Sequence, residues 1–589
     1  IDLGEHHDDV TMLYFCQVSY SNFSVAVSED GESWSDDYIA DMAEGECFQW
    51  KYLTPSYMGK DKYGNDKRFF YSQPIKFSAR YVRITSQQIG LKMNEVIFQD
   101  ANGDRIPATV IAQLNVMEES TLYSDANNIF DEQDTLEGLP SWWNSTYFDE
   151  IYHARTAYEH LHGTAPYETS HPPLGKVIMS LGIAIFGMVP FGWRVMGALA
   201  GILMLPAMYL LGKQLSKKSS FAFAAALMLA LDCQHFTQTR IATIDSYPVL
   251  FILFSWLFML RFMQRDIVRL PVKKFLPDLA LSGLFMGLGI ASKWIGVYSG
   301  VGLAVAFFWT IFRHMRMAAT SAHLLKTDKS LSDEDRKILT LRDQTTMKRV
   351  LVICLWCLLF FVAIPLAIYL LAYIPYFAYA HFDNLKDYLT AVWNAQLSMF
   401  SYHSKPGLGM DHPFYSPWYE WIFNQRPMYY ASPTYVNTPG WSYAIWCFGN
   451  PAIWSAALVG FAYTVFMWAK RHRYTLRKDG ETLHWTAADW DVTMPFLLLS
   501  ALSQFLPWVL VPRGTYIYHY FATTPFLMLS ITVLFRDITR RFPKTGKWLL
   551  GIFLGVCLVM FVAYFPYASG ALTPTWWLDF MEQFLRIYY

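Results

Sequence analysis

Hydrophobic and polar residues alternate over the first part of the chain. Segments 23–28, 79–85 and 95–98 place an apolar residue at about every second position, and turn-forming residues such as those at 29–31 separate such segments. This period is expected of strands that bury one face. The pattern predicts a β-sandwich over residues 1–107, followed by a polar linker over 108–146.

Beyond residue 173 the pattern changes to long apolar runs. Because a helix needs roughly 20 apolar residues to cross a bilayer, these runs predict a polytopic α-helical membrane protein with about ten spans. The predicted spans are 195–212, 219–235, 243–263, 276–293, 295–312, 350–375, 441–469, 493–511, 516–535 and 548–567.

Basic residues gather in every second connection between these spans. They lie at 213–218, 261–274, 313–349, 470–478 and 536–547, and positively charged loops stay on the cytoplasmic side. The β-sandwich and the loop 376–440 are therefore expected on the outer face. A crossing by the short run 174–186 would reverse this order, so we expect that run to lie along the outer surface.

The first residues, Ile1 to Gly4, resemble the middle of a strand, so a further span is expected upstream, which would bring the total to about eleven. Composition agrees with a membrane protein, since 53% of the residues are hydrophobic and 16% are charged. The net charge of −1 gives no indication of nucleic-acid binding. Cys16 and Cys47 could form a disulfide if the outer region faces an oxidising compartment, or remain apart.

The candidate chemistry lies between the two patterns, in segment 147–192. It contains the adjacent acids Asp149 and Glu150, and His171 before two prolines. Further ionisable residues occur at the outer ends of spans, where a structural anchoring role is the alternative. The cations among them suit a lipid phosphate, because arginine offers a planar fork and lysine a point charge; they are Arg194, Arg240, Lys293 and Arg513.

Several motifs resemble known families. The runs YFDEIYHARTAYEHLHG and HPPLGK, PFGWR at 190–194, QTRIATID, SKWIG, YIYHYF and the segment 403–430 are similar to the protein O-mannosyltransferase family of GT-C membrane glycosyltransferases. In the first region, SEDGESW and ARYVRIT resemble a discoidin (coagulation factor type C) jelly roll. These resemblances imply a discoidin-like domain followed along the chain by a GT-C transmembrane domain over 193–589. Members of the discoidin family often bind carbohydrate or lipid head groups.

The mannosyltransferase resemblance implies transfer of mannose, with inversion, from a polyprenyl phosphate to Ser or Thr hydroxyls of proteins. Asp149 is the expected general base and Glu150 its support, while Arg194, Lys293 and Arg513 would bind the donor phosphate. Arg240 is a further candidate that could instead pair with Asp232 or Asp245. The predicted substrate-binding residues are His171, His403, His412, Trp418, Trp421, Tyr518 and His519. No metal or other cofactor is expected.

Three other functions remain open at this stage. The enzyme could glycosylate a cell-envelope glycan or lipid, since no acceptor motif distinguishes these from protein. A lipid or sugar transporter is disfavoured because the ionisable residues gather at one face and no internal repeat occurs. A surface lectin with an inactive membrane part is disfavoured by the acidic pair and the cations together. A bacterial plasma membrane is the expected location, and the sequence leaves the oligomeric state open.

Overall fold

The computed structural model describes residues 1–18, 23–40, 48–60, 66–71, 73–86, 92–114, 125–136, 138–433, 438–470, 476–479, 482–485 and 491–586. The chain forms two compact units. The first comprises Ile1–Arg155, Phe186–Gly192 and Ala431–Ser442, and the second comprises Thr156–Ile185, Trp193–Tyr430 and Tyr443–Tyr589. Each unit is described by itself.

The first unit is built on antiparallel strands in the order β3-β2-β7-β1-β8-β9, with β4 also paired to β1. β1 pairs with β7 along its first half and with β8 along its second half. Its register shifts at Asp2/His7 and His7/Val10, near Gly4 and Asp9, whose φ angles are 85° and 54°. Such bulges bend a strand, and here they let one strand serve two partners. The strands are β1 (Asp2–Val18), β2 (Phe23–Ser28), β3 (Tyr38–Ile39), β4 (Trp50–Tyr52), β5 (Ser56–Lys60), β6 (Asp66–Phe70), β7 (Phe77–Ser86), β8 (Lys92–Gln99) and β9 (Arg105–Ile106).

Part of the segment predicted as a linker packs on this sheet. It forms two short 3-10 helices, η1 (Ala126–Phe130) and η2 (Gln133–Thr135). Phe130 packs against the buried core of the sheet, and the Gln133 side-chain amide donates to the Val96 carbonyl at 2.7 Å. The N-terminal sheet domain therefore extends past residue 107. Cys47 lies outside the described residues, so its pairing with Cys16 stays a prediction.

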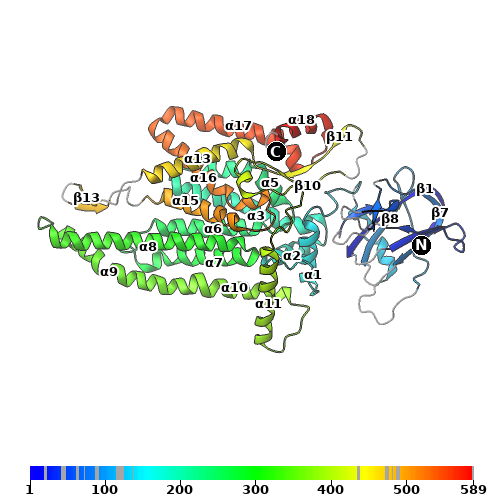
Figure 1. The fold of residues 1–589 in the computed structure, drawn as a ribbon, viewed down its shortest axis with the longest axis horizontal. Coiled ribbons are helices and arrows are strands. Elements are labelled where there is room, and N and C mark those ends of the chain that lie inside the picture. Colours follow the sequence, from blue (N-terminus) through cyan, green and yellow to red (C-terminus); the bar gives the residue numbers. More distant parts are fainter. Residues whose placement is uncertain are drawn as a thin grey trace. The chain divides into compact units, whose positions relative to one another are not determined.

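The rest of the chain is mainly helical (Figure 1). Its helices are α1 (Glu150–Leu161), α2 (Leu174–Phe186), α3 (Pro190–Ser216), α4 (Ser219–Ala230), α5 (Cys233–Arg240), α6 (Ser246–Met263), η3 (Val272–Lys274), α7 (Leu276–Ser292), α8 (Ile295–Thr327), α9 (Asp333–Leu358), η4 (Leu359–Ala363), α10 (Ile364–Tyr376), α11 (Leu385–Ser404), α12 (Trp418–Trp421), α13 (Pro451–Ala469), α15 (Thr493–Phe505), η5 (Leu506–Leu510), η6 (Ile517–Ala522), α16 (Thr524–Arg541), α17 (Pro543–Ser569) and α18 (Thr575–Arg586). Short strands connect them: β10 (Met428–Ala431), β11 (Trp441–Ser442), β12 (Ile445–Cys447), β13 (Leu476–Asp479), β14 (Thr482–Trp485) and β15 (Thr573–Pro574).

Seven helical segments in the described part of the chain are long and apolar enough to cross a membrane. They are Pro190–Ser216, Ser246–Met263, Ile295–Thr327, Asp333–Tyr376, Pro451–Ala469, Thr493–Leu510 and Pro543–Ser569. The other three predicted spans contain α4 with 12 residues, α7 with 17 residues and α16, whose last turns carry Arg536, Arg540 and Arg541. The predicted class, a polytopic helical membrane protein with an N-terminal sheet domain, is confirmed.

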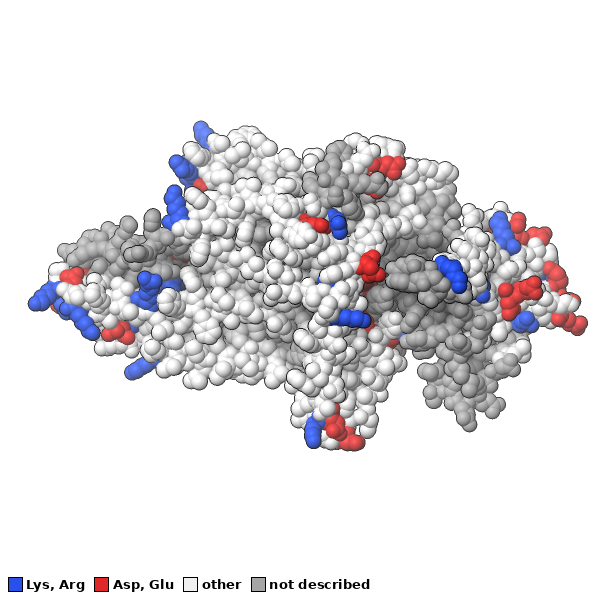
Figure 2. Space-filling model, viewed as in Figure 1, with Lys and Arg blue, Asp and Glu red and all other residues white. Residues whose placement is uncertain are grey.

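Charge is distributed along the helical unit as expected for this class. Figure 2 shows a belt of helical surface without Lys, Arg, Asp or Glu, and basic side chains gathered at one end of the bundle. At that end the Arg536 guanidinium donates to the Leu215 carbonyl at 2.9 Å and the Gln214 amide donates to Gln264 at 2.7 Å. The ends of α3, α6 and α16 therefore meet there.

Two features of the bundle follow from its sequence. A π-helical turn, η4, joins α9 to α10 just before Pro365, which cannot continue normal helical hydrogen bonding. α7 packs on this turn so closely that a Cβ at Gly283 would lie 2.1 Å from the Phe360 carbonyl oxygen.

α11 runs across the direction of α8, α9 and α10 (Figure 1). One face of α11 packs on Tyr373 and Tyr376 through Val392 and Met399.

The sheet domain contains a buried acid that makes its stability depend on pH. Burial, reinforced by the Asp131 carboxylate and opposed by the Glu132 backbone N–H, raises the pKa of Glu95 in β8 to about 8. Because this value exceeds the unfolded one, the stabilisation is complete below about pH 4.5 and is lost as pH rises through about 8. We predict that Glu95→Gln slows hydrogen exchange of peptide 92–99 at about pH 8.5 and has little effect at about pH 5. Equal effects at both pH values would contradict a protonated Glu95.

Candidate active site

Lys293 is held by a buried ion pair at the junction of two helices. It follows α7 in an extended conformation, and its ammonium lies 2.7 Å from the Asp245 carboxylate, which directly precedes α6. Both side chains are more than nine-tenths buried, with exposed fractions of 9% and 8%. Since a buried charge is stable only when it is compensated, the pair fixes the start of α6 against the end of α7.

The aromatic motif 516–521 lies beside Lys293. The Lys293 ammonium is 6.0 Å from the centre of the Tyr518 ring, within range of a cation–π interaction. His519 is buried, and its Nδ1 accepts from the Tyr516 backbone N–H at 3.0 Å. This bond fixes the imidazole at the start of η6. Tyr518 and His519, both predicted to bind substrate, are thus brought next to a predicted phosphate-binding residue.

Arg513 is the cation of this region whose charge remains available. Its Nη1 donates to the Gly514 carbonyl at 3.4 Å, and its buried Nε has no hydrogen-bond partner among the described residues. No described carboxylate lies within ion-pair distance of it. The positive charge of Arg513 acts on His403, His519 and Tyr298. An anion near these groups would therefore find Arg513 uncompensated.

Glu168 organises the turn that contains His171. Its carboxylate accepts from the Lys176 ammonium, from the Ser170 backbone N–H at 2.7 Å and from His171 Nδ1 at 3.1 Å. Its own backbone N–H donates to the Thr156 hydroxyl of α1 at 2.9 Å. Lys176 is fully buried. Glu168 and Lys176 form a second compensated pair, and this pair sets the orientation of the His171 ring.

His403, at the end of α11, lies on the same turn. Its Nε2–H donates to the Ser170 carbonyl at 2.7 Å, and its ring is 5.2 Å from that of His171. Burial, aided by the positive charges of Arg513 and Lys293, lowers the pKa of His403 to about 4. The imidazole is therefore neutral at physiological pH. Nε2 is the protonated nitrogen and Nδ1 is an acceptor.

The loop 376–440 is hydrogen-bonded to the segment that carries Arg513. The Gly514 N–H donates to the Leu408 carbonyl at 2.7 Å and the Ser416 N–H to the Thr515 carbonyl at 2.9 Å. A Cβ at Gly514 would lie 2.4 Å from the Gly409 carbonyl oxygen, so only glycine fits this contact. The loop therefore positions the backbone on both sides of Arg513.

Three predicted residues of this loop have distinct surroundings. The His412 ring lies 5.3 Å from that of Tyr516, and the partly buried Trp418 packs on Phe505. Trp421 is completely buried and donates from its indole nitrogen to the Ser416 hydroxyl at 3.0 Å. Trp421 therefore supports the wall of the site from behind.

The two remaining predicted cations lie on other helices. The Arg194 guanidinium lies 5.8 Å from the ring of the buried Trp193 in α3, and Arg240 lies 5.5 Å from Phe236 in α5. The two carboxylates considered for Arg240 have other contacts: Asp245 pairs with Lys293, and Asp232 accepts from the Trp454 indole at 3.1 Å.

The acidic pair belongs to the first unit, whose boundary with the second falls within α1. Phe148 has a φ of 50°, and this turn precedes Glu150, the first residue of α1. Glu150 is fully buried, and its carboxylate accepts from the Tyr147 N–H at 3.2 Å. Asp149 is half-buried. The Glu150 side chain thus joins the first residue of α1 to the turn before it, and the two carboxylates have different environments.

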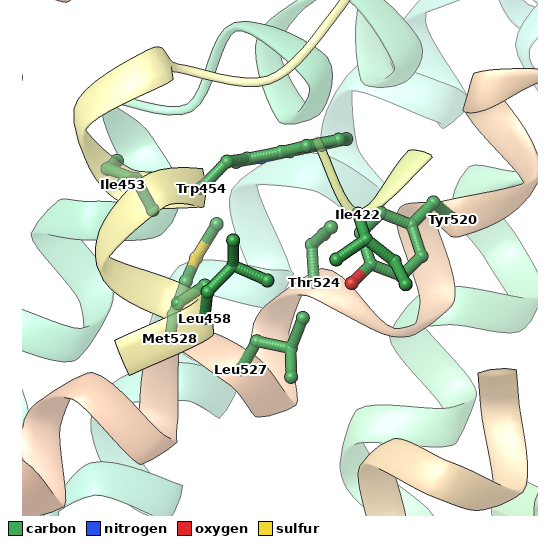
Figure 3. A pocket seen from close by; sticks show the side chains of 9 residues that line it. Ile422, Ile453, Trp454, Leu458, Tyr520, Thr524, Leu527 and Met528 are labelled. Atoms are coloured by element: carbon green, nitrogen blue, oxygen red, sulfur yellow. The ribbon is translucent and has the colours of Figure 1, made fainter. Parts of the chain in front are cut away.

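No group of three or more His, Cys, Asp or Glu residues suited to a metal occurs in the described ranges; the absence of a metal cofactor stays a prediction. Figure 3 shows an apolar pocket in which the Trp454 ring forms one wall and Ile422 and Tyr520 lie on the other side. Its volume is about 10 Å³, about that needed by one water. A sugar or a prenyl chain cannot occupy this pocket.

Two family descriptions match the chain. Residues 184–385 match the family described as "Dolichyl-phosphate-mannose-protein mannosyltransferase", and residues 388–579 match the "C-terminal four TMM region of protein-O-mannosyltransferase". Together they cover about two thirds of the chain. The chain belongs to the protein O-mannosyltransferase family.

Relatives of this chain include bacterial enzymes. A polyprenol-phosphate-mannose–protein mannosyltransferase of Mycolicibacterium smegmatis is 25% identical over 447 residues, which are 68% of this chain and 78% of that protein. The enzyme of the same name from Mycobacterium tuberculosis is 25% identical over 462 residues, 70% of this chain and 80% of that protein. The S. cerevisiae protein O-mannosyltransferase Pmt1-Pmt2 complex, solved with the sugar donor, has a TM-score of 0.57 at 12% identity and covers 73% of this chain and 87% of its own. The GT-C fold predicted from the motifs is confirmed.

Sequence reasoning missed two members of the site. Glu168 was not named at all, and Asp245 was named only as a possible partner for Arg240, yet they neutralise Lys176 and Lys293. The spacing of eight residues between Glu168 and Lys176, across two prolines, is a signal for a tight turn. The contact between Asp245 and Lys293 spans 48 residues, and nothing in the local sequence indicates it.

The Glu168–Lys176 pair predicts a non-additive effect on stability. Lys176→Met leaves the Glu168 carboxylate buried without its cation, which costs about 3–5 kcal/mol in comparable pairs. We therefore expect a strongly lowered melting temperature for the detergent-solubilised protein. The double variant Glu168→Gln, Lys176→Met removes both charges and should recover most of this loss. Additive effects of the two substitutions would contradict a compensated pair.

Proposed function

We propose that this protein transfers a mannosyl residue from a polyprenyl-phosphate donor to Ser or Thr hydroxyls of proteins, at the outer face of a bacterial plasma membrane. Membership in the protein O-mannosyltransferase family is the observation that carries this proposal. The mycobacterial relatives are named for this reaction. The available charge of Arg513 beside neutral histidines supports a phosphate-bearing donor.

Transfer with inversion requires one base. The acceptor hydroxyl oxygen forms a bond to the anomeric carbon of mannose while the bond from that carbon to the phosphate oxygen breaks, and the hydroxyl proton moves to the base. Asp149 suits this role because it is half-buried, whereas Glu150 is fully buried and its carboxylate accepts from the Tyr147 N–H. The electron pair of the broken bond leaves with the lipid phosphate, so no general acid is required.

The leaving phosphate determines which cations matter. A polyprenyl phosphomannose diester carries one negative charge, and the released monoester carries up to two. Arg513 offers uncompensated charge, whereas Lys293 is neutralised by Asp245 at 2.7 Å. Arg513 would therefore stabilise the charge that develops in the transition state, a contribution that is usually the largest in such sites. Lys293 and Asp245 would position Tyr518 and His519.

Substitution of the acidic pair tests the base assignment. Asp149→Asn should lower transfer to a Ser/Thr-rich peptide at least about 100-fold, because positioned proton transfer contributes that much or more. Glu150→Gln should cause a milder loss, because a glutamine oxygen can still accept from the Tyr147 N–H. The measurement is transfer of labelled mannose by the purified, detergent-solubilised enzyme. Equal losses in both variants would exclude Asp149 as the single base.

The same assay distinguishes the acceptor class. If the donor is consumed but no peptide is labelled, the acceptor is a cell-envelope glycan or lipid, and such molecules replace the peptide in the assay. If wild type and both variants leave the donor intact, the proposed donor is wrong.

Arg513 and Lys293 should differ in their effects. Removal of a preorganised donor to a developing charge lowers kcat by about 100-fold or more, which we expect for Arg513→Gln with little change in melting temperature. Lys293→Met leaves Asp245 buried without its cation, so its main effect should be on stability. Both are measured by peptide mannosylation and thermal unfolding. An Arg513→Gln enzyme with wild-type kcat would remove Arg513 from the mechanism.

A further inference from the structure

A polar cavity of about 860 Å³ lies at the basic end of the helical bundle. It is lined where α3, α6 and α16 end and α15 begins, by Gln214, Leu215, Lys217, Arg261, Gln264, Arg265, Asp491, Val492, Thr493, Arg536 and Arg540. α6 separates it from the Asp245–Lys293 pair, and a helix of 18 residues is about 27 Å long. The cavity is therefore distinct from the candidate active site.

Positive charge exceeds negative charge around this cavity. Arg261 and Arg265 share the single carboxylate of Asp278, at 2.9 and 3.4 Å. Arg536 and Arg540 share that of Asp537, at 2.7 and 3.4 Å, in the same way.

Two further charged groups complete the lining. Asp491 accepts from the Thr493 N–H at the start of α15, and Lys217 donates to the Gln264 side chain at 3.2 Å. Among the described residues of the lining and their ion-pair partners, five cations thus face three carboxylates. Partial burial, with a smaller contribution from the positive charge of Arg265, lowers the pKa of Lys217.

The cationic groups are held by the fold. Arg313 of α8 donates to the Met263 carbonyl at 2.7 Å, His314 donates to the Arg265 carbonyl at 3.2 Å, and Arg349 of α9 donates to the Ile267 carbonyl at 3.0 Å. These bonds fix the backbone on both sides of Arg265. Arg536 is 5% exposed and caps the end of α3 at the Leu215 carbonyl. Unlike basic residues spread over a surface, these converge from three helix ends.

The donor types indicate the ligand. Guanidinium groups match the oxygens of a phosphate, and the Gln214 and Gln264 amides add neutral donors. Basic pockets between membrane helices bind the head groups of anionic lipids, and the belt without charged residues begins beside this end of the bundle (Figure 2). We propose that this cavity binds a phosphate group, carried by an anionic phospholipid or by a soluble phosphate compound.

Thermal unfolding of the full detergent-solubilised chain tests the proposal. The probes are phosphatidylglycerol, phosphatidylcholine with the same acyl chains, and inorganic phosphate. A ligand that binds only the folded protein raises its melting temperature, here by about 3 °C or more at saturation. The test variant is Lys217→Gln with Arg540→Gln, both exposed side chains of the lining. The matched control is Lys218→Gln with Arg541→Gln, which removes equal charge from neighbouring positions outside the lining.

A phospholipid site would be established if phosphatidylglycerol raises the melting temperature more than phosphatidylcholine does, and if the test variant loses this difference while the control variant keeps it. The same pattern with inorganic phosphate, and no advantage of phosphatidylglycerol, would establish a soluble phosphate. Absence of any shift, or equal loss in test and control variants, would overturn the proposal. If the double variant unfolds without ligand, native mass spectrometry of the single variant Lys217→Gln counts bound lipid directly. A lipid occupancy equal to that of the wild type would overturn the proposal.

Discussion

A charge placed inside an apolar helical bundle is stable only when an opposite charge or several donors compensate it, and much of this structure follows from that constraint. Lys293 with Asp245, Lys176 with Glu168 and Arg342 with Asp266 are all buried pairs. The first and third join segments that lie far apart in the sequence, so the need for compensation also fixes which segments meet. The Lys293–Asp245 and Lys176–Glu168 pairs hold polar groups of the candidate active site in place, whereas the Arg342–Asp266 pair lies at the other end of α6.

This constraint explains the functional difference among the cations. A lysine with its own carboxylate presents almost no net charge to a ligand, however close the ligand lies. Arg513 is held by backbone contacts of its loop and by no described carboxylate. Its charge is therefore preorganised without being neutralised. The same condition recurs at the opposite end of the bundle, where two arginine pairs each share one carboxylate.

Much of the fold could be predicted from the sequence, because strand alternation and apolar runs are local signals. Two helices begin or end away from the predicted spans because a local break interrupts the apolar run. The run 219–235 is divided by Asp232, whose side chain accepts from the His235 N–H and starts α5. The run 516–535 begins with the 3-10 turn η6, which the Tyr516–His519 bonds stabilise, so α16 starts only at Thr524. The hydrophobic pattern indicates neither break, although Asp232 is a recognisable helix-capping residue.

The site was less predictable than the fold. The types of its residues were recognisable, since cations and histidines at span ends stand out against apolar neighbours. Their partners were not, because the Asp245–Lys293 contact depends on how α6 packs against α7. Burial is equally hidden from the sequence: Trp421, which was predicted to contact substrate, is completely buried, and its role stays a prediction. Pairing and burial are tertiary properties that a single sequence does not contain.

α11 gives the site a defined depth. Its outward side carries Leu385, Leu389, Trp393, Leu397 and Phe400, all between 40% and 71% exposed, in a stripe along the whole helix. A helix that runs across the bundle with such a stripe is most stable where hydrocarbon gives way to head groups. His403 occupies its last turn and reaches the Ser170 carbonyl. A helix with this surface would hold His403, and His171 beside it, at the level of the phosphates of the bilayer.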